Sequence, residues 1–215
     1  MTEKEVREVV RRLIEEYPEA DCTLDYNREK PYELLFAVRL AAQCTDERVN
    51  RVTPGLFSRF PDLEALSGAP VEEIEEEIRS CGFYRTKARD IRECAGILLH
   101  RYGGKIPETM EELTALPGVG RKTANLILGD VFQVPGSVTV DTHCIRLSNR
   151  IGLVTGLREP EKIERELRAV LPAEDSARFC HCIVEHGRAV CKARKPECEK
   201  CCLRDLCRSF RENEE

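Results

Sequence analysis

The densest group of potentially reactive side chains is a run of cysteines near the C-terminus. Five of the 12 cysteines lie between residues 191 and 207, and four of them follow the spacing Cys191-x6-Cys198-x2-Cys201-x5-Cys207. Four thiolates on one short, lysine-rich segment can enclose a metal centre. A structural zinc ion usually takes two close cysteine pairs, whereas an iron–sulfur cluster is larger and tolerates wider gaps. Because one pair alone is close here, the spacing favours iron–sulfur, with zinc and unrelated buried thiols as alternatives.

Cys202 adjoins Cys201 and creates a second possible register, with gaps of 6, 3 and 4 residues. We expect Cys202 to be a small buried side chain instead. The chain opens with Met1-Thr2-Glu3-Lys4-Glu5 and shows no secretory or organellar leader, so we expect a cytoplasmic protein. Disulfides are rare in that compartment, so the clustered cysteines again indicate a metal site.

A second group is the glycine-rich segment Leu116-Pro117-Gly118-Val119-Gly120-Arg121-Lys122-Thr123-Ala124, which must form a tight turn. Gly118 and Gly120 permit positive φ and the close approach of another backbone, and the N-terminus of the following helix directs free amides at a phosphate. A P-loop is excluded because a residue separates Gly120 from Lys122. A dinucleotide fingerprint is excluded because Thr123 occupies the third glycine position and no strand precedes it. A helix-hairpin-helix that holds a DNA phosphate remains, beside an ordinary helix connection.

Two residues near this turn could perform covalent chemistry. Lys122 falls in the first helical turn, where the local positive potential disfavours the protonated amine. A neutral lysine can act as a nucleophile. The alternatives without catalysis are a solvated surface lysine and a simple contact to a phosphate. Asp141, in Val140-Asp141-Thr142-His143-Cys144, precedes an amphipathic stretch and predicts a helix N-cap. The same carboxylate could instead face a cleft.

Charge and hydropathy restrict the class of protein. The formal net charge is −5, so any nucleic-acid site must be local. From Gly187 to Arg211, eight Lys and Arg residues face three Asp and Glu residues, which is a local excess of +5 that overlaps the cysteines. Arg39 interrupts the longest apolar run, Leu34 to Ala42, far short of the roughly 18 residues that a membrane helix needs. We therefore expect no membrane span.

The elements that must position these groups are helices. Apolar residues recur at helical spacing in residues 6–14, 88–99 and 124–131. Helix starts are indicated by Pro31, Pro70, Pro107 and Pro160. The strand-like run at residues 138–140 is too short to found a sheet, so we predict an all-α fold. A length of 215 residues suits one large domain or two small ones.

Together these residues resemble the endonuclease III branch of the helix-hairpin-helix DNA glycosylases. The resemblance covers nearly the whole chain. It rests on Glu33-Leu34-Leu35 through Ala42-Gln43-Cys44-Thr45-Asp46, the segment Gly82 to Ala88, the LPGVGRKTAN hairpin, VDTH, the His186-Gly187-Arg188 triplet and the cysteine signature. It implies two helical domains flanking a DNA-binding cleft. Residues 24–135 would form the domain with the hairpin, and residues 1–23 plus 136–215 the domain with the cluster loop.

The resemblance also implies a function. The expected activity is that of a bifunctional DNA glycosylase and AP lyase of base excision repair, which excises oxidised pyrimidines from duplex DNA. It would then nick the abasic site by β-elimination through a lysine Schiff base. Relatives that remove mismatched adenine or thymine carry Ser or Tyr where Lys122 stands, so Lys122 favours the bifunctional type. The implied partner is double-stranded DNA with a damaged base or abasic site, bound by a monomer associated with the nucleoid in a prokaryote.

Residue roles follow from the same resemblance. Lys122 would be the nucleophile at C1′ of the damaged nucleotide and Asp141 the assisting carboxylate. Gln43 would fill the gap left by the flipped base and Phe83 would wedge beside the opposite base. The alternatives are a polar residue at a helix C-terminus and a core residue, respectively.

The remaining implied roles concern phosphate and iron. The backbone of the DNA would be contacted by Gly118, Val119, Gly120 and Arg121. A 4Fe-4S cluster would be ligated by Cys191, Cys198, Cys201 and Cys207. Two other classes of protein compete with this reading: a non-catalytic DNA-binding protein that uses the hairpin for backbone contacts, and a zinc-stabilised helical adaptor.

Overall fold

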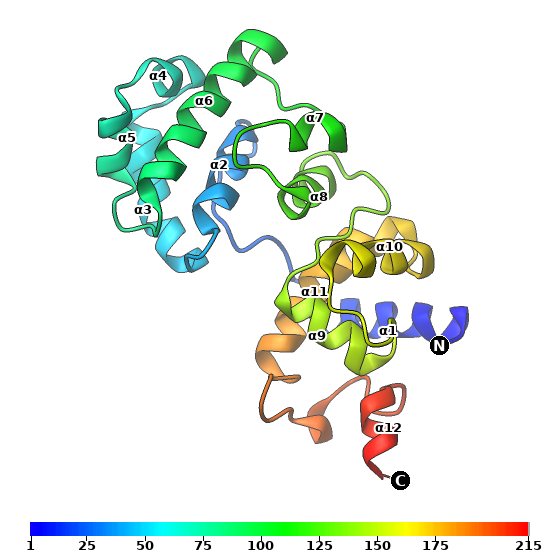
Figure 1. Ribbon diagram of the computed structural model, residues 1–215. Helices are drawn as coiled ribbons and strands as arrows, with labels where there is room; N and C mark the ends of the chain where they lie inside the picture. The colour runs from blue at the N-terminus through cyan, green and yellow to red at the C-terminus, as the bar shows by residue number, and fades with distance from the viewer. Residues whose placement is uncertain (215) are drawn as a thin grey trace. The chain divides into compact units, whose positions relative to one another are not determined.

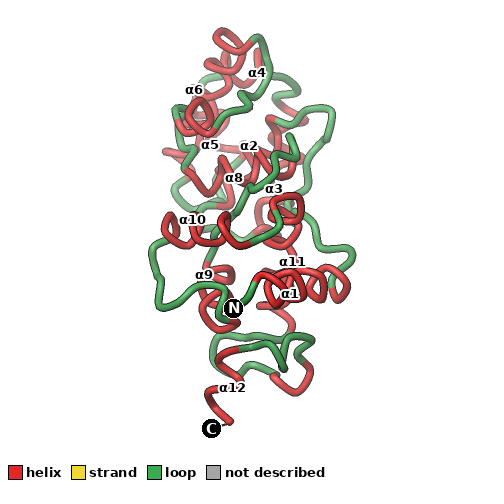
Figure 2. The backbone as a smooth tube through the Cα atoms, turned by 90° about the vertical axis from the view of Figure 1, so that its right-hand side faces the viewer, coloured by secondary structure: helices red, strands yellow, loops and turns green. Residues whose placement is uncertain are grey.

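The computed structural model describes residues 1–214, and in that range the chain is all-helical with no strand (Figures 1 and 2). The predicted fold class is confirmed. The chain divides into two compact units. The terminal unit combines Met1–Cys22 with the chain from Phe132 onward, and the central unit is Thr23–Val131. No helix of the described chain combines the length and apolar character needed to cross a bilayer.

The terminal unit is built from the first helix and the last third of the chain. Its helices are α1 (Glu3–Glu16), α9 (Thr142–Ile151), α10 (Pro160–Val170), α11 (Ser176–Ala189) and α12 (Arg208–Glu214), with short 3-10 turns η1 (Ala173–Asp175) and η2 (Cys198–Lys200). Helix α1 starts at a capping box, in which the Thr2 hydroxyl accepts from the Glu5 amide and the Glu5 carboxylate accepts from the Thr2 amide. The helix α1 then packs against α11.

The core of the terminal unit joins one apolar face from each helix. Its buried side chains include Val6, Val9, Val10, Leu13, Leu147, Ile151, Ile163, Leu167, Phe179 and Ile183. Their spacing along each helix is the 3.6-residue period read from the sequence. Leu203 is fully buried in the same core although it lies in the cysteine-rich segment. That segment is therefore anchored to the terminal unit by an apolar side chain.

The central unit holds a run of consecutive helices. They are α2 (Tyr32–Ala41), α3 (Asp46–Arg59), α4 (Leu63–Gly68), α5 (Val71–Glu77), α6 (Tyr84–Tyr102), α7 (Met110–Thr114) and α8 (Arg121–Asp130). The long helix α6 packs against α2, α4 and α5, as Figure 1 shows. Pro31 and Pro70 directly precede α2 and α5, and Pro160 is the first residue of α10, as predicted. Pro107 lies before α7, whose N-cap is Thr109.

Helix α2 is the innermost helix of the central unit. Residues 32–37 and Leu40 are buried, so the helix is covered on nearly every side. Its last turn leads directly to Gln43, and its one basic residue is Arg39. A buried helix that ends at a predicted DNA contact gives that contact a rigid base.

Candidate functional site

The glycine-rich segment forms the predicted turn between α7 and α8, which pack against each other. Gly118 has φ +71°, a left-handed conformation that a side chain would strain. Gly120 does not use this freedom: its φ is −100°, and a Cβ added there would meet no atom within 4 Å. Of the two glycines, Gly118 alone has a positive φ and a close neighbour, and that neighbour is formed by the side chains of Arg39 and Asp90 and not by another backbone. Gly120 is instead the N-cap of α8.

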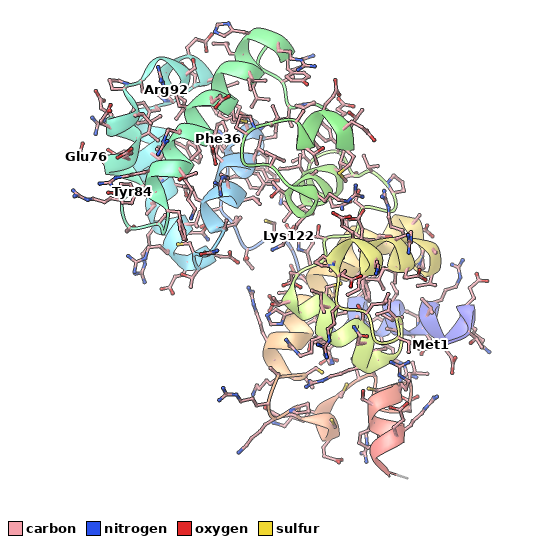
Figure 3. The ribbon with its side chains drawn as sticks, viewed as in Figure 1. Met1, Phe36, Glu76, Tyr84, Arg92 and Lys122 are labelled. Atoms are coloured by element: carbon pink, nitrogen blue, oxygen red, sulfur yellow. The ribbon has the colours of Figure 1, made fainter. Side chains whose placement is uncertain are left out.

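The N-terminus of α8 is open. Its N-cap is a glycine, and no side chain caps the first turn. The first backbone N–H groups of a helix have no partner within the helix, and together with the helix dipole they form an anion site. Arg121 and Lys122 are both exposed in this first turn, and Figure 3 labels Lys122 at the start of α8. The turn therefore presents amides, an arginine and a lysine to solvent together.

Gln43 and Phe83 lie on two loops of the central unit that touch. Both residues adopt left-handed backbone conformations, with φ of 55° and 58°. A Cβ on Gly82 would lie 3.5 Å from the Gln43 carbonyl oxygen, so segments far apart in the sequence are neighbours here. Both side chains point outward, since Gln43 is exposed and Phe83 is 67% exposed.

Phe83 is not the core residue that was the alternative interpretation. Burying a phenylalanine stabilises a protein by about 1.5–3 kcal/mol, and a left-handed residue with a side chain costs about 1–2 kcal/mol. Because it is exposed, Phe83 lacks the stabilisation that burial would give. Its left-handed backbone also adds conformational strain. The stability of the fold therefore does not account for this placement.

Asp141 occupies the predicted N-cap of α9. One carboxylate oxygen, Oδ1, accepts from the Cys144 amide at 2.7 Å. No hydrogen bond to the other oxygen, Oδ2, is found within the described residues. The cap fixes the carboxylate while one oxygen stays available. Asp141 is half-buried, so it is also reachable from solvent.

The VDTH and HGR motifs meet inside the terminal unit. A Cβ on Gly187 would lie 3.0 Å from the Arg146 guanidinium and would also collide with the ring of His143. The glycine of HGR is thus required by the close packing of α9 on α11. Burial lowers the pKa of His143, and the positive charge of Arg146 adds to this effect. The pair of motifs therefore orients the helix that Asp141 caps.

Cys191, Cys198, Cys201 and Cys207 line one loop of the terminal unit, and each is half-buried. Arg150 donates to one of the sulfurs, and His186 lies within hydrogen-bond distance of another. The Arg150 guanidinium is 3.4 Å from Cys191 Sγ, and His186 Nε2 is 3.3 Å from Cys201 Sγ. Donors aimed at cysteine sulfur are what thiolate ligands of a metal centre use to disperse negative charge.

Three arginines brace the backbone of this loop. Arg12 donates to the Cys202 carbonyl at 3.0 Å and pairs with Asp205 at 2.6 Å. Arg146 donates to the Cys191 carbonyl at 3.0 Å, and Arg150 donates to the carbonyls of residues 192 and 193 at 2.8 and 2.7 Å. The loop is held by α1 and α9. Nothing in the sequence pattern indicated that these arginines serve the cysteine segment.

The buried environment of the loop disfavours free thiolates. Burial raises the pKa of the Cys201 thiol to about 12, and the neighbouring cysteines act in the same direction. Burial likewise raises the pKa of Cys207. His186 is 1% exposed and hydrogen-bonds to the Tyr17 hydroxyl at 3.0 Å, and burial lowers its pKa to about 4. Burial therefore favours the protonated thiol at Cys201 and Cys207.

Zinc and iron–sulfur centres make different demands on four cysteine ligands. Among the described residues, no three His, Cys, Asp or Glu side chains are gathered closely enough to hold a single metal ion. A zinc ion needs its sulfur ligands within about 2.3 Å of one point, whereas a 4Fe-4S cluster separates its ligands by the width of the cluster.

Most of the Lys and Arg side chains of the C-terminal segment form ion pairs or hydrogen bonds within the protein. Lys192 and Lys200 pair with Glu197, Arg204 pairs with Glu199, and Arg208 donates to backbone carbonyls of Asn149 and Val154. Arg194 and Lys195 are exposed between the first two cysteines, and no ion pair involves them in the part of the chain that the structure describes. The local excess of positive charge is therefore concentrated on the loop.

Sequence reasoning overlooked Asn125, one turn after Lys122 in α8. It is 1% exposed, and neither polar atom of its amide has a hydrogen-bond partner in the described structure. An unpaired buried amide costs about 1–3 kcal/mol. The sequence motif included Asn125 but gave no signal of its burial, because helix periodicity does not reveal whether a polar position faces inward.

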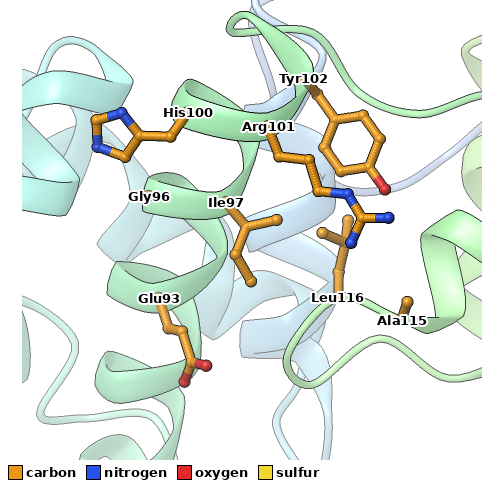
Figure 4. Close-up of a pocket in the computed structure, with 8 residues that line it drawn as sticks. All are labelled: Glu93, Gly96, Ile97, His100, Arg101, Tyr102, Ala115 and Leu116. Atoms are coloured by element: carbon orange, nitrogen blue, oxygen red, sulfur yellow. The ribbon is translucent and has the colours of Figure 1, made fainter.

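A pocket of about 390 Å³ lies on the outer face of α6 (Figure 4). It is lined by Glu93, Gly96, Ile97, His100, Arg101, Tyr102, Ala115 and Leu116. None of the predicted catalytic or DNA-contacting residues lines it. The candidate site of the central unit is instead formed by the hairpin turn and the touching loops at Gln43 and Phe83.

Comparison with known proteins gives consistent matches. A family model described as "HhH-GPD superfamily base excision DNA repair protein" matches residues 36–173. Endonuclease III of Synechocystis sp. is 51% identical over 193 residues, which cover 90% of this chain and 87% of the relative. Endonuclease III of Escherichia coli (strain K12) is 40% identical over 200 residues, which cover 93% of each chain.

Solved structures give the same result. The chain resembles a trapped endonuclease III–DNA covalent intermediate with a TM-score of 0.89 and 38% identity, over 100% of both chains. It also resembles a thermostable thymine-DNA glycosylase with a TM-score of 0.85, over 97% of this chain and 98% of the other. That second likeness has 23% identity and concerns the fold alone.

Proposed function

This chain belongs to the endonuclease III family of HhH-GPD base excision DNA repair proteins, and from that premise we propose that it is a bifunctional enzyme. Family membership supports a DNA glycosylase of base excision repair. Our proposal adds the substrate and the second step: oxidised pyrimidines are excised from duplex DNA, and the abasic site is cut by β-elimination. The observation that carries it is the exposed Lys122 in the uncapped first turn of α8.

The first step is departure of the damaged base. Breaking the bond between base and sugar builds positive charge on the sugar, and a nearby carboxylate stabilises that charge. Asp141 is suited to this task because its Oδ1 is held by the Cys144 amide while Oδ2 is available. We assign Asp141 to the departure of the base and Lys122 to the attack that follows.

The second step uses the amine. Neutral Lys122 attacks C1′ and loses a proton, and the C1′–O4′ bond breaks to open the sugar ring and leave a Schiff base. This Schiff base acidifies the neighbouring C2′ hydrogen. Loss of that proton expels the 3′ phosphate and breaks the strand. The attacking amine must be neutral, because a protonated amine has no lone pair with which to form the bond. A trapped covalent DNA intermediate has been solved for an endonuclease III of the same fold, which supports this route.

Base flipping needs side chains that replace the lost stacking, at a cost of a few kcal/mol. Gln43 and Phe83 are exposed, lie on touching loops and hold left-handed backbones. We assign Gln43 to the vacated gap and Phe83 to the wedge beside the opposite base. The amides of residues 118–121 would hold a backbone phosphate.

We further propose a 4Fe-4S cluster on Cys191, Cys198, Cys201 and Cys207. When bound, the cluster would supply four iron–sulfur bonds that fix the loop. Arg150 donates to Cys191 Sγ, His186 Nε2 contacts Cys201 Sγ, and Leu203 anchors the loop in the core. The loop would then present Arg194 and Lys195 to the DNA backbone.

Borohydride trapping tests the proposal. Wild type, Lys122→Ala and Asp141→Asn are incubated with duplex DNA that carries one oxidised pyrimidine, and borohydride reduces any Schiff base to a stable adduct. We expect an adduct with wild type, none with Lys122→Ala and slower formation with Asp141→Asn. Released base without an adduct in wild type would indicate a monofunctional glycosylase. Tight binding without base release would indicate a non-catalytic DNA-binding protein.

A further inference from the structure

Arg39 is the basic residue that interrupts the most apolar stretch of the sequence. In the structure its guanidinium forms an ion pair with Asp90. The Arg39 Nε donates to Asp90 Oδ2 on α6 at 2.7 Å, and a second guanidinium nitrogen donates to the same oxygen. The two side chains are 19% and 20% exposed. A partly buried ion pair contributes little net stability, because desolvation offsets most of the attraction. Its effect is to fix the geometry of the groups around it.

The hairpin turn rests directly on this ion pair. A Cβ added to Gly118 would lie 2.6 Å from Arg39 Cδ and 2.8 Å from Asp90 Oδ2. These distances are far below normal van der Waals contact. Gly118 is therefore glycine for two reasons: its φ of +71°, and the absence of space above the ion pair.

The same two helices are tied a second time, one turn away. Lys87 on α6 is 1% exposed, and its ammonium donates to the carbonyls of Leu40 and Ala42 at 2.8 and 2.7 Å. A cation at the C-terminal carbonyls of a helix is favourable, so Lys87 closes the end of α2 just before Gln43. Thus α6, whose first turn follows Phe83, is joined to the end of α2 at both Lys87 and Asp90.

We propose that the Arg39–Asp90 pair is a positioning element for DNA binding. It sets the hairpin turn at a fixed place relative to the ends of α2 and α6, so that the phosphate site, Gln43 and Phe83 engage the same stretch of duplex. Arg39 acts through Gly118 and does not itself contact DNA. This inference rests on the proposed function, because it assigns the turn to a DNA phosphate.

The first experiment measures binding and cleavage separately, using the full-length protein. Binding is measured on duplex DNA with a tetrahydrofuran abasic-site analogue, and β-elimination is measured in single turnovers on a natural abasic site. We compare Arg39→Met, which keeps the aliphatic stem, with Arg39→Lys. The matched control is Arg59→Met, which removes the pairs of Arg59 with Glu73, Glu76 and Glu77 elsewhere in the central unit.

We expect Arg39→Met to weaken binding roughly tenfold, since small displacements of a binding group are costly, and to leave the saturating cleavage rate within about twofold. Arg39→Lys should recover part of the loss, and Arg59→Met should bind as wild type does. A lower melting temperature with unchanged affinity of the folded fraction would overturn the proposal in favour of a purely structural pair.

Salt dependence separates positioning from direct contact. A phosphate ligand, when removed, lowers the slope of log Kd against log salt by about one. We expect the slope of Arg39→Met to match wild type at weaker affinity. A slope reduced by about one would overturn the proposal and make Arg39 a DNA contact.

A double-mutant cycle tests the contact with Gly118. Gly118→Ala is made in wild type and in Arg39→Ala, where the space above Asp90 is larger. We expect Gly118→Ala to cost less affinity in the Arg39→Ala background, because part of the collision is relieved while the backbone strain remains. Equal costs in both backgrounds would show that the turn does not depend on the pair. If wild type binds the analogue but cuts no abasic DNA, the lyase proposal fails while these binding measurements still test the pair.

Discussion

The hairpin of the central unit and the cysteine loop of the terminal unit treat their polar groups in opposite ways. The hairpin leaves the first turn of α8 uncapped and Lys122 exposed. The cysteine loop has its carbonyls and two of its sulfurs engaged by Arg12, Arg146, Arg150 and His186. The first turn of α8 thus lacks a side-chain cap, whereas the polar groups of the cysteine loop are engaged within the fold.

The glycines of the two motifs differ in how closely other atoms pack around them. Gly118 and Gly187 are both required by close packing, against Arg39 and Asp90 in one unit and against His143 and Arg146 in the other. Gly120 has open space around its Cβ position, and it leaves the helix N-terminus accessible. Packing therefore constrains Gly118 and Gly187, whereas it does not constrain Gly120. The four predictions below test this division.

The largest effect is expected for the cluster ligands. Cys198→Ser should abolish stoichiometric iron, because a cluster with three thiolate ligands is readily lost. Cys202→Ser should retain iron, since the ligand set we propose excludes Cys202. Iron analysis and visible absorbance of the purified proteins check both variants. Loss of iron from Cys202→Ser, with iron retained in Cys201→Ser, would establish the alternative register.

The second effect concerns the two hairpin glycines. Gly118→Ala adds left-handed strain of about 1–2 kcal/mol to a collision with the ion pair, so we expect a clear loss of stability. Gly120→Ala should cost about 1 kcal/mol or less, because it changes an N-cap that has open space around it. Chemical denaturation of both variants measures the difference. Equal destabilisation by the two substitutions would contradict the distinct roles of these residues.

The third effect separates stability from function at Phe83. Because the side chain is 67% exposed, Phe83→Ala should change the free energy of unfolding by no more than about 0.5 kcal/mol. Base excision from duplex DNA should still slow by roughly tenfold, since the wedge no longer offsets unstacking. Phe36→Ala, which empties a fully buried position, is the contrasting control and should cost about 3–5 kcal/mol. Full excision activity in Phe83→Ala would remove the wedge assignment.

The smallest effect is expected for the alkylation of Cys94, which should not react. Cys94 is 2% exposed, and burial raises the pKa of its thiol to about 12, so its thiolate is scarce at neutral pH. We expect iodoacetamide to leave Cys94 unmodified whether or not iron is present. The four loop cysteines should react once a chelator removes the iron. Mass spectrometry of the alkylated peptides distinguishes these two groups of cysteines.

Several features were predictable because they depend on neighbours in the chain. Helix α1, the N-cap at Asp141 and the turn before Lys122 follow from residues within one or two helical turns. Local hydrogen bonds and backbone preferences act at that range, so a sequence pattern expresses them directly. The different conformations of Gly118 and Gly120 were not predictable, because a glycine permits several conformations and its neighbours do not select one.

The sequence by itself determined the all-α class, the order of the motifs and the chemistry that each motif can offer. Tertiary structure alone decided which of them meet. It set Gln43 beside Gly82, placed Gly118 on the Arg39–Asp90 pair and brought Arg12 to the cysteine loop 190 residues away. The physical reason is that a charge such as that of Arg39 has no preferred partner until packing removes water around it. Helix periodicity indicates whether a side chain faces the core or the solvent. Tertiary packing determines which residues that side chain contacts.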